Sequence, residues 1–497
     1  MENMTRTNPV AMYLRENRRS YSSQQGGRSE LFRRLGAAGA VLLLSFFSAE
    51  AQTQPTTQSL DGLWLTDGYG DLIEFQGEDL RIYEITSLSC IFARKATRRP
   101  EASTANEIVF AGENDTLRIL PGASPDTRWL HEDWSVSNVL LRRTSSRPEP
   151  CGQPSADTPL ANYQVLWEAF AEQYPFFELR QMDWLAVDKK YRSQVTPSTK
   201  PDELFNILRE MIEPLHDAHT WIDAKSIQQF FHGRRPTADP MQKRNAGRIT
   251  EIIETNYLHG GLHDYCNKQL QFGVLRSAQL GNSTAPGFIG YLRIHSFADY
   301  SSDREWVKQL KVLEAALDAI FKDSSKLTGL VIDLRINRGG SDVFGISIAS
   351  RLAVREYLAY SKVSRNDIHD AGHRTPAQPV VVHVSQRPGF HGPVVVLTSS
   401  DSVSAAETFT MALLDRQPHV IRVGANTQGV FSDVLVRRLP NGWKFGLPNE
   451  IYLTKDGETF DGVGVPPDIA VPIFAAEDVS SGRDAALEKA LELLSLK

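Results

Sequence analysis

From Phe288 onward the sequence alternates short apolar runs with segments of helical periodicity, and this alternation restricts the fold more than any other feature. The strand-like runs occupy residues 288–294, 330–334, 380–384, 394–397, 420–423, 434–439 and 443–447, and the helix-like segments occupy residues 306–321, 344–352 and 408–414. Alternating strands and helices are typical of a sheet covered by helices. We therefore predict an α/β domain over residues 288–475, followed by a C-terminal helix at 476–497.

The remaining length points to further domains. A chain of 497 residues exceeds the size at which a single hydrophobic core stops growing. Residues 52–155 contain strand-like runs separated by turn residues, such as Leu80–Ile85 and Thr116–Leu120, and end in a stretch rich in Pro, Ser and Gly. We predict a small N-terminal β-rich domain and linker there.

A helical cap domain is expected between the β-rich domain and the α/β domain. Apolar residues recur at helical spacing toward its end, at Leu204, Leu208, Met211 and Leu215. We place this cap at residues 156–225. Residues 226–287 are polar and contain Gly, and we expect an irregular insert there.

The first 51 residues have the pattern of a secretory signal peptide. Arg33 and Arg34 precede a 13-residue apolar run, which ends in the small-residue pattern Ser48-Ala49-Glu50-Ala51. Thirteen residues are too few to span a bilayer. We expect cleavage near Ala51 and a periplasmic or secreted protein, with a membrane anchor or a buried core helix as the alternative.

The three cysteines and the charge balance limit the possible ligands. Cys90 and Cys151 lie in the same predicted domain, so a disulfide between them with Cys266 free is one interpretation, and three unpaired buried thiols are the other. No spacing of the cysteines resembles a zinc site, and we expect neither metal nor cofactor. A net charge of −6 without a basic run argues against nucleic-acid binding.

One serine lies where a nucleophile can be generated. Ser404 follows the apolar strand 393–397 and precedes the helix-like segment, at a strand-to-helix turn, with Ser400 and Ser402 as rival candidates. The strand 330–335 ends in Gly339-Gly340, whose backbone N–H groups can approach a bound carbonyl oxygen. The sequence therefore indicates a nucleophile together with donors for an oxyanion.

A serine hydroxyl needs a neighbouring base to take its proton. Among twelve histidines, His219 stands just past a predicted helix between two small residues, with Asp217 and Asp223 near it in sequence. We select His219 as the candidate base. An ordinary surface or helix-capping histidine is the alternative, because His is common at helix C-termini.

Four motifs resemble one known family. They are Asp-Leu-Arg-x-Asn-x-Gly-Gly at 333–340, Ser-Ala-Ala-Glu at 404–407, Gly-Val-Gly-Val-Pro-Pro-Asp at 462–468 and Leu-His-Asp-Ala-His-Thr at 215–220. In their order along the chain they resemble the C-terminal-processing (tail-specific) serine peptidases, over roughly residues 158–475. The resemblance implies a crotonase-like (ClpP/crotonase) α/β spiral core with a helical cap.

The same resemblance implies roles for individual residues. Ser404 corresponds to the nucleophile of an acyl-enzyme mechanism, and the N–H groups of Gly339, Gly340 and Ala405 correspond to the oxyanion hole. The catalytic lysine that follows a Thr-x-Gly turn in the tail-specific branch is replaced here by Val430.

This replacement favours the tricorn-core-like branch, in which a cap histidine acts as base with an acidic residue in support. His219 and Asp461 match those positions. For Asp461 the alternative is a plain Asp-Gly turn with no catalytic role.

We therefore expect an exported serine peptidase that acts on a peptide or protein substrate, without nucleic acid, and possible assembly into a homo-oligomer stays open. A non-catalytic peptide- or lipid-binding protein on the same fold, or an esterase, is the alternative. The PDZ domain usual in this family is not recognisable in residues 226–287, so selection of substrates by a free C-terminus is in doubt.

Overall fold

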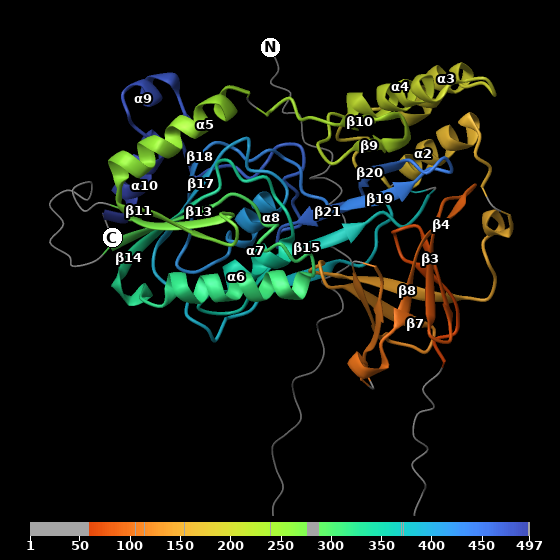
Figure 1. Ribbon diagram of the computed structural model, residues 1–497, viewed down its shortest axis with the longest axis horizontal. Coiled ribbons are helices and arrows are strands. Elements are labelled where there is room, and N and C mark those ends of the chain that lie inside the picture. Colours follow the sequence, from red (N-terminus) through yellow and green to blue (C-terminus); the bar gives the residue numbers. More distant parts are fainter. Residues whose placement is uncertain are drawn as a thin grey trace, which may run out of the picture. The chain divides into compact units, whose positions relative to one another are not determined.

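The structure is a computed structural model that describes residues 59–495, apart from residues 105, 114, 154, 239, 276–287, 369 and 371 and the side chains of 240–244 (Figure 1). The predicted signal peptide at 1–51 lies outside the described residues. Among the helices of the described part, none combines the length and the apolar character that crossing a membrane requires.

The N-terminal β-rich segment forms a closed antiparallel barrel in which each strand pairs with the next and β8 pairs with β1 (Figure 1). Its strands are β1 (Gly62–Thr66), β2 (Asp71–Gln76), β3 (Asp79–Ile85), β4 (Cys90–Arg98), β5 (Ile108–Ala111), β6 (Thr116–Pro121), β7 (Thr127–Glu132) and β8 (Asn138–Thr144). Alternate residues are buried, as Leu80 and Ile82 are in β3. Closure removes the free sheet edges that an open sheet would expose.

The predicted disulfide is confirmed. Cys90, at the start of β4, is bonded to Cys151 across 61 residues of sequence, and Cys266 is free and buried. Because Cys151 lies in the linker, the bond ties the linker back to the barrel.

The helical cap comprises α2 (Pro159–Gln173), α3 (Trp184–Tyr191) and α4 (Pro201–Ile212). Their apolar faces share one core with a four-stranded sheet of order β10-β9-β20-β19. This sheet joins the cap strands β9 (Trp221–Ala224) and β10 (Gln229–His232) to β19 (Val434–Arg438) and β20 (Lys444–Pro448). Strands separated by about two hundred residues of sequence therefore fasten the cap to the C-terminal half.

The α/β domain is built on a seven-stranded sheet of order β11-β12-β13-β14-β17-β18-β22. The strands are β11 (Leu258–Tyr265), β12 (Leu270–Leu275), β13 (Phe288–Ile294), β14 (Leu327–Asp333), β17 (Val394–Thr398), β18 (Ile421–Gly424) and β22 (Ile469–Ala470). From β13 to β22 the pairing is parallel, while β11 and β12 are antiparallel.

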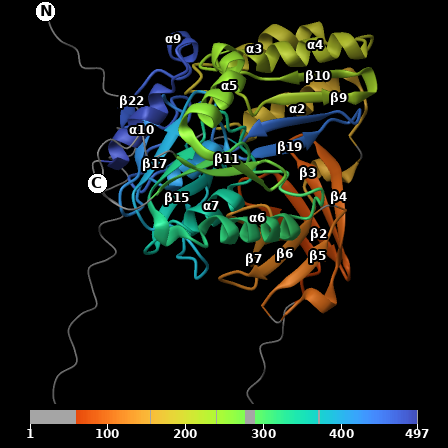
Figure 2. The same ribbon diagram turned by 60° about the vertical axis from the view of Figure 1, so that its left-hand side comes forward.

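Helices cover both faces of this sheet (Figures 1 and 2). On one face lie α6 (Trp306–Phe321), α7 (Asp342–Ser350) and α8 (Ala405–Ala412), and on the other lie α5 (Pro240–Ile252), α9 (Ala476–Ser480) and α10 (Ala485–Ser495). In β14, Leu330 and Ile332 pack on the first face and Val331 on the second. A strand buried on both faces needs a continuous apolar run, which is the pattern of this segment.

A three-stranded sheet of order β16-β15-β21 and several short helical turns complete the fold. The sheet contains β15 (Tyr357–Ser364), β16 (Gln378–Val382) and β21 (Glu450–Leu453). The turns are η1 (Pro100–Ala102), η2 (Glu149–Gly152), η3 (Arg192–Gln194), η4 (Glu213–Leu215), η5 (Lys225–Ile227), the π-helical η6 (Ile253–Tyr257) and η8 (Ser324–Lys326).

The expectation of an irregular insert at 226–287 is wrong for its described part. This segment supplies β10, α5 and the strands β11 and β12, which extend the main sheet beside β13. Two features explain why hydrophobic periodicity did not indicate these elements. The register of β11 shifts between His259 and His263, where two glycines interrupt the alternation, and α5 is a polar helix.

Candidate active site

Ser404 lies at the junction between β17 and α8 with a strained backbone. Its φ of 59° and ψ of −121° fall in a region that residues with a Cβ rarely adopt. The turn is held by a hydrogen bond of 3.1 Å from the Ser404 N–H to the Glu407 carboxylate and by one of 3.2 Å from the Val403 N–H to the Asn337 carbonyl oxygen. Such a turn holds the serine side chain out from the helix terminus.

The Gly339-Gly340 segment lies directly against this turn. A Cβ on Gly339, where φ is +80°, would come within 2.7 Å of the Ser404 Cβ, and one on Gly340 would come within 2.2 Å of the Phe297 carbonyl oxygen. Only glycine permits this approach. The strand end predicted to supply oxyanion donors therefore packs on the predicted nucleophile.

The N–H groups around Ser404 are not equally available. The buried Asn337 side chain accepts the Gly339 N–H at 2.8 Å and donates to the Ile294 carbonyl oxygen. Within the described part of the chain, the N–H groups of Gly340 and Ala405 make no hydrogen bond. Of the three predicted oxyanion donors, Gly340 and Ala405 are thus free, and Gly339 is engaged.

Glu407, the last residue of the Ser-Ala-Ala-Glu motif, connects the serine turn to a neighbouring loop. It is fully buried and accepts hydrogen bonds from the Ser404, Gly429 and Val430 N–H groups and from the Thr427 hydroxyl, at 2.6–3.1 Å. Burial raises the pKa of Glu407 to about 7, against these hydrogen bonds, which favour the charged form. One carboxylate thereby fixes the serine turn and the 427–430 loop together.

His219 comes from the loop between η4 and β9 and is half-buried. Its N–H donates to the Asp217 carboxylate at 3.0 Å, and its Nδ1 is buried without a hydrogen-bond partner among the described residues. Burial lowers the pKa of His219 below its usual value, against Asp217 and Asp433, which raise it. The imidazole is therefore neutral at pH 7 and can accept a proton.

The 427–433 segment interacts with the surroundings of both Ser404 and His219. Val430 is bound to Glu407 beneath the serine turn, and Asp433 acts electrostatically on the His219 ring. Within residues 59–495 as described, no hydrogen bond joins the His219 ring to the Ser404 hydroxyl. Catalytic hydrogen bonds are often long before substrate binds, so a pair of this kind can close on binding.

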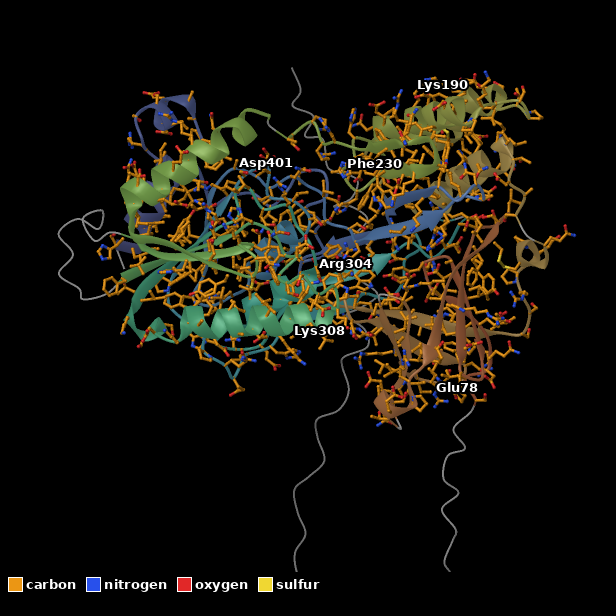
Figure 3. The ribbon with its side chains drawn as sticks, viewed as in Figure 1. Glu78, Lys190, Phe230, Arg304, Lys308 and Asp401 are labelled. Atoms are coloured by element: carbon orange, nitrogen blue, oxygen red, sulfur yellow. A yellow bond between two sulfur atoms is a disulfide. The ribbon has the colours of Figure 1, made fainter. Side chains whose placement is uncertain are left out.

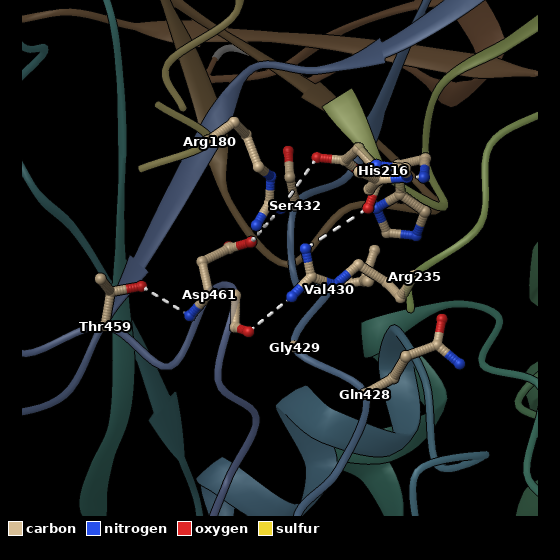
Figure 4. A network of polar contacts seen from close by, with 12 residues as sticks. Arg180, His216, Arg235, Gln428, Gly429, Val430, Ser432, Thr459 and Asp461 are labelled. Carbon is tan, nitrogen blue, oxygen red and sulfur yellow. Dashed lines mark hydrogen bonds and ion pairs between the residues drawn. The ribbon is translucent and has the colours of Figure 1, made fainter. Parts of the chain in front are cut away.

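Asp461 belongs to a buried charged network rather than to a pair with His219 (Figure 4). Arg180 lies 3.1 Å from Asp217 and 3.7 Å from Asp461, and Arg235 donates to the carbonyl oxygens of His216 and Gly462. Burial, followed by Asp217, raises the pKa of Asp461 well above its usual value. In the described structure Asp461 therefore helps fasten the cap loop to the 461–464 turn, and its acidic neighbour is Asp217.

Two family models match the chain in the order of its domains. The model described as Peptidase family S41 matches residues 288–471, and the model described as Tricorn protease C1 domain matches residues 156–213. The α/β domain is therefore similar to peptidase family S41. The resemblance predicted from the motifs is confirmed, and the tricorn match falls on the helical cap.

Two relatives illustrate this similarity. The carboxy-terminal-processing protease of Bartonella bacilliformis is 29% identical over 192 residues, and the match covers 37% of this chain and 39% of that relative. The chain thus spans about two fifths of the length of this curated relative. A candidate peptidase from Parabacteroides merdae is similar in structure, with a TM-score of 0.54 and 26% identity over 68% of this chain and 97% of that one.

The lysines of this chain do not offer a second base. Val430 occupies the position after Thr427-Gln428-Gly429 and is buried, while Lys444 and Lys455 are exposed. Lys362 is buried, but it lies 2.7 Å from Asp433 and 3.0 Å from Glu450. Burial lowers the pKa of Lys362, but the two carboxylates outweigh burial and raise it well above its usual value. Lys362 therefore stays charged and cannot accept a proton.

The sequence pattern did not indicate the residues that hold this site together. It marked Glu407 only as part of a motif, although an acidic residue in the first turn of a helix is a known capping signal. Arg180 and Asp433 carried no local signal at all. Their roles depend on contacts between the cap, the 427–433 segment and the 461–464 turn.

Proposed function

We propose that this chain is an exported serine peptidase that hydrolyses peptide bonds through an acyl-enzyme, with Ser404 as nucleophile and His219 as base. The observation that carries the proposal is the left-handed Ser404 turn packed on Gly339-Gly340, with two free N–H groups beside it. The similarity to family S41 and the neutral imidazole of His219 support it. We further propose a crotonase-like spiral for the core, which the run of parallel strands from β13 to β22 supports.

The reaction would proceed in two halves. Ser404 Oγ attacks the scissile carbonyl carbon as His219 takes the hydroxyl proton, and the N–H groups of Ala405 and Gly340 stabilise the oxyanion. The start of α8 adds a partial positive charge at the same point. The amine leaves with the proton from His219, and water then hydrolyses the ester by the same route.

Export is supported by the Cys90–Cys151 disulfide, because such bonds persist in oxidising compartments. With the signal pattern at 1–51, it favours a periplasmic or secreted protein. The substrate is then a peptide or protein of that compartment.

The proposal is tested by active-site labelling and by burst kinetics. A fluorophosphonate probe should attach to Ser404, as mass spectrometry of the labelled tryptic peptide would identify. An activated ester should give a burst of one product equivalent per chain if acylation precedes slower deacylation. Absence of both labelling and turnover of a peptide panel would reject the peptidase.

A non-catalytic binding protein is the second candidate, since His219 and Ser404 are not hydrogen-bonded in the described structure. Such a protein would retain a peptide stoichiometrically and leave it intact. Equilibrium dialysis followed by mass analysis of the recovered peptide separates the two candidates, and hydrolysis of ester but not amide substrates would identify an esterase.

Gly339→Ala should disable the site through crowding as well as through backbone strain. The new Cβ would lie 2.7 Å from the Ser404 Cβ, so the nucleophile must move. We expect kcat to fall roughly 100-fold, the effect of a misplacement of about 1 Å, and the free energy of unfolding to fall by about 1–3 kcal/mol.

Gly442→Ala is the matched control for this substitution. Gly442 has φ of +84°, and a Cβ there would meet no atom within 4 Å. It should show a similar strain cost in urea unfolding with unchanged kcat. Equal kcat for the two variants would contradict the close packing of Gly339 on Ser404.

A further inference from the structure

A cavity lies between one end of the barrel and the catalytic domain. It measures about 280 Å³ and is lined on the barrel side by residues of β1–β4, β7, β8 and the loop after β7. On the other side it is lined by residues 433–438, together with Asn449 and Glu450. The barrel end concerned carries Asp71 and Glu84, which pair across β2 and β3, while the hairpin at Glu78 marks the opposite end.

This cavity borders both halves of the candidate active site. In the loop after β7, the Trp134 carbonyl oxygen accepts the Ser341 hydroxyl at 3.1 Å, and Ser341 directly follows Gly340. Across the cavity, Asp433 is one of the two carboxylates that act on His219. The walls of the cavity are therefore linked to the residue after Gly340 by a hydrogen bond and to His219 electrostatically.

The walls of the cavity carry more negative than positive charge. The carboxylates are Asp71, Glu84, Glu132, Asp433 and Glu450, and the cations are Arg94, Arg437 and Arg438. Five carboxylates against three guanidinium groups leave two unmatched negative charges. Lys362 lies 2.7 Å from Asp433 and 3.0 Å from Glu450. Its positive charge reduces the excess to one negative charge.

The buried carboxylate of Glu450 belongs to this wall. It is 2% exposed, accepts the Tyr69 hydroxyl on Oε1, and its Oε2 lies 3.0 Å from Lys362 Nζ.

The titration of the wall agrees with this surplus of negative charge. Burial raises the pKa of Asp71 to about 6, with Glu84 and Glu132 adding to the rise, although Arg437 lies 3.2 Å away. Burial also raises the pKa of Glu450 to about 7. A cation entering the cavity would favour the charged forms of both groups.

Part of the lining is apolar and suits an alkyl chain. Ile82, Leu130, Val139 and Trp134 line the cavity from the barrel side. Lysine and arginine side chains combine a long apolar stem with a cationic head. Their methylenes match these walls, and their N–H groups match the carboxylates.

We propose that this cavity is a substrate subsite that accepts a basic side chain, Lys or Arg, of the bound peptide. The proposal rests on the peptidase activity proposed above and assigns the barrel a role in selecting substrates. Glu132 and Asp71 contact the cationic head in this subsite, and Ile82, Leu130 and Val139 contact its stem.

The test uses fluorescence-quenched peptides that differ from one another at a single position. That position carries Lys, Arg, Met or Glu, and it is moved in turn through the four residues on each side of the scissile bond. The full chain should cleave the Lys and Arg peptides at one position with kcat/KM at least 10-fold above Met. The difference should lie mainly in KM. No preference for a basic residue at any position, with Ser404 still labelled by fluorophosphonate, would overturn the subsite alone, and absent labelling would overturn it together with the peptidase.

Glu132→Gln should reduce the basic preference to about threefold or less while fluorophosphonate labelling continues. Its partner Arg94 keeps an ion pair with Asp115, so the fold has a remaining contact. Asp71→Asn is the second variant, should Glu132→Gln fail to fold. Glu78→Gln is the matched control, since Glu78 is exposed at the far end of the barrel (Figure 3) and should leave the preference unchanged. Equal preference in all three variants would overturn the proposal.

A free amine separates the peptide side chain from a small cationic ligand as occupant. Cadaverine should inhibit cleavage of the Lys peptide competitively and leave the Met peptide unaffected. Equal effects on the two peptides, or activation of both, would assign the cavity to a free cation and overturn the subsite.

Discussion

Ser404→Ala should abolish peptide turnover and fluorophosphonate labelling, with kcat reduced roughly 10⁴- to 10⁶-fold. The substitution removes only the hydroxyl group, and the hydrogen bond from the Ser404 N–H to the Glu407 carboxylate is kept, so the turn should persist. Thermal unfolding of the variant should therefore match that of the wild type, and the loss can be assigned to chemistry.

Ser402→Ala distinguishes the rival serine. The Ser402 hydroxyl is fully buried, donates to the Leu334 carbonyl oxygen at 2.8 Å and accepts the Ser399 N–H. Its removal should cost about 1–3 kcal/mol of stability and leave labelling intact. Loss of labelling in Ser402→Ala but not in Ser404→Ala would mean that the nucleophile is misassigned.

His219→Ala should lower kcat/KM roughly 10²- to 10⁴-fold, because the serine loses the group that accepts its proton. The matched control is His216→Asn. His216 is exposed with φ of 48°, a conformation that asparagine tolerates, and its contact to Arg235 is through the backbone. The control should keep its rate within about twofold. Similar losses in both variants would point to damage to the loop rather than to loss of a base.

The pH dependence of the wild type tests the same assignment. Burial disfavours the imidazolium of His219 and lowers its pKa, so the neutral, proton-accepting form should persist to lower pH than for an exposed histidine. We expect kcat/KM to fall on the acid side with a midpoint below about 6.5. In His219→Ala, the residual kcat/KM should no longer show this fall at acid pH. A rate that rises only above about pH 9 would indicate a lysine base instead.

Hydrophobic periodicity alone predicts most of the α/β domain. The predicted strand at 288–294 and helix at 306–321 coincide with β13 and α6. The strand is buried on both faces and the helix is amphipathic, so the order of apolar residues predicts both elements. By contrast, α5 and β11 were missed, because one is polar and the other is interrupted at a glycine pair.

The candidate site also has features that the sequence predicts and features that it does not. The strand-to-helix turn at Ser404, the Gly-Gly strand end and the similarity to family S41 were predictable, because they depend on the order of neighbouring residues. Three further features depend on the folded chain: which N–H groups are free, the position of Asp461 beside Arg180, and the acidic cavity between the barrel and residues 433–438. Such contacts join segments tens to hundreds of residues apart, and the burial and charge that act on each group arise only once the chain has folded.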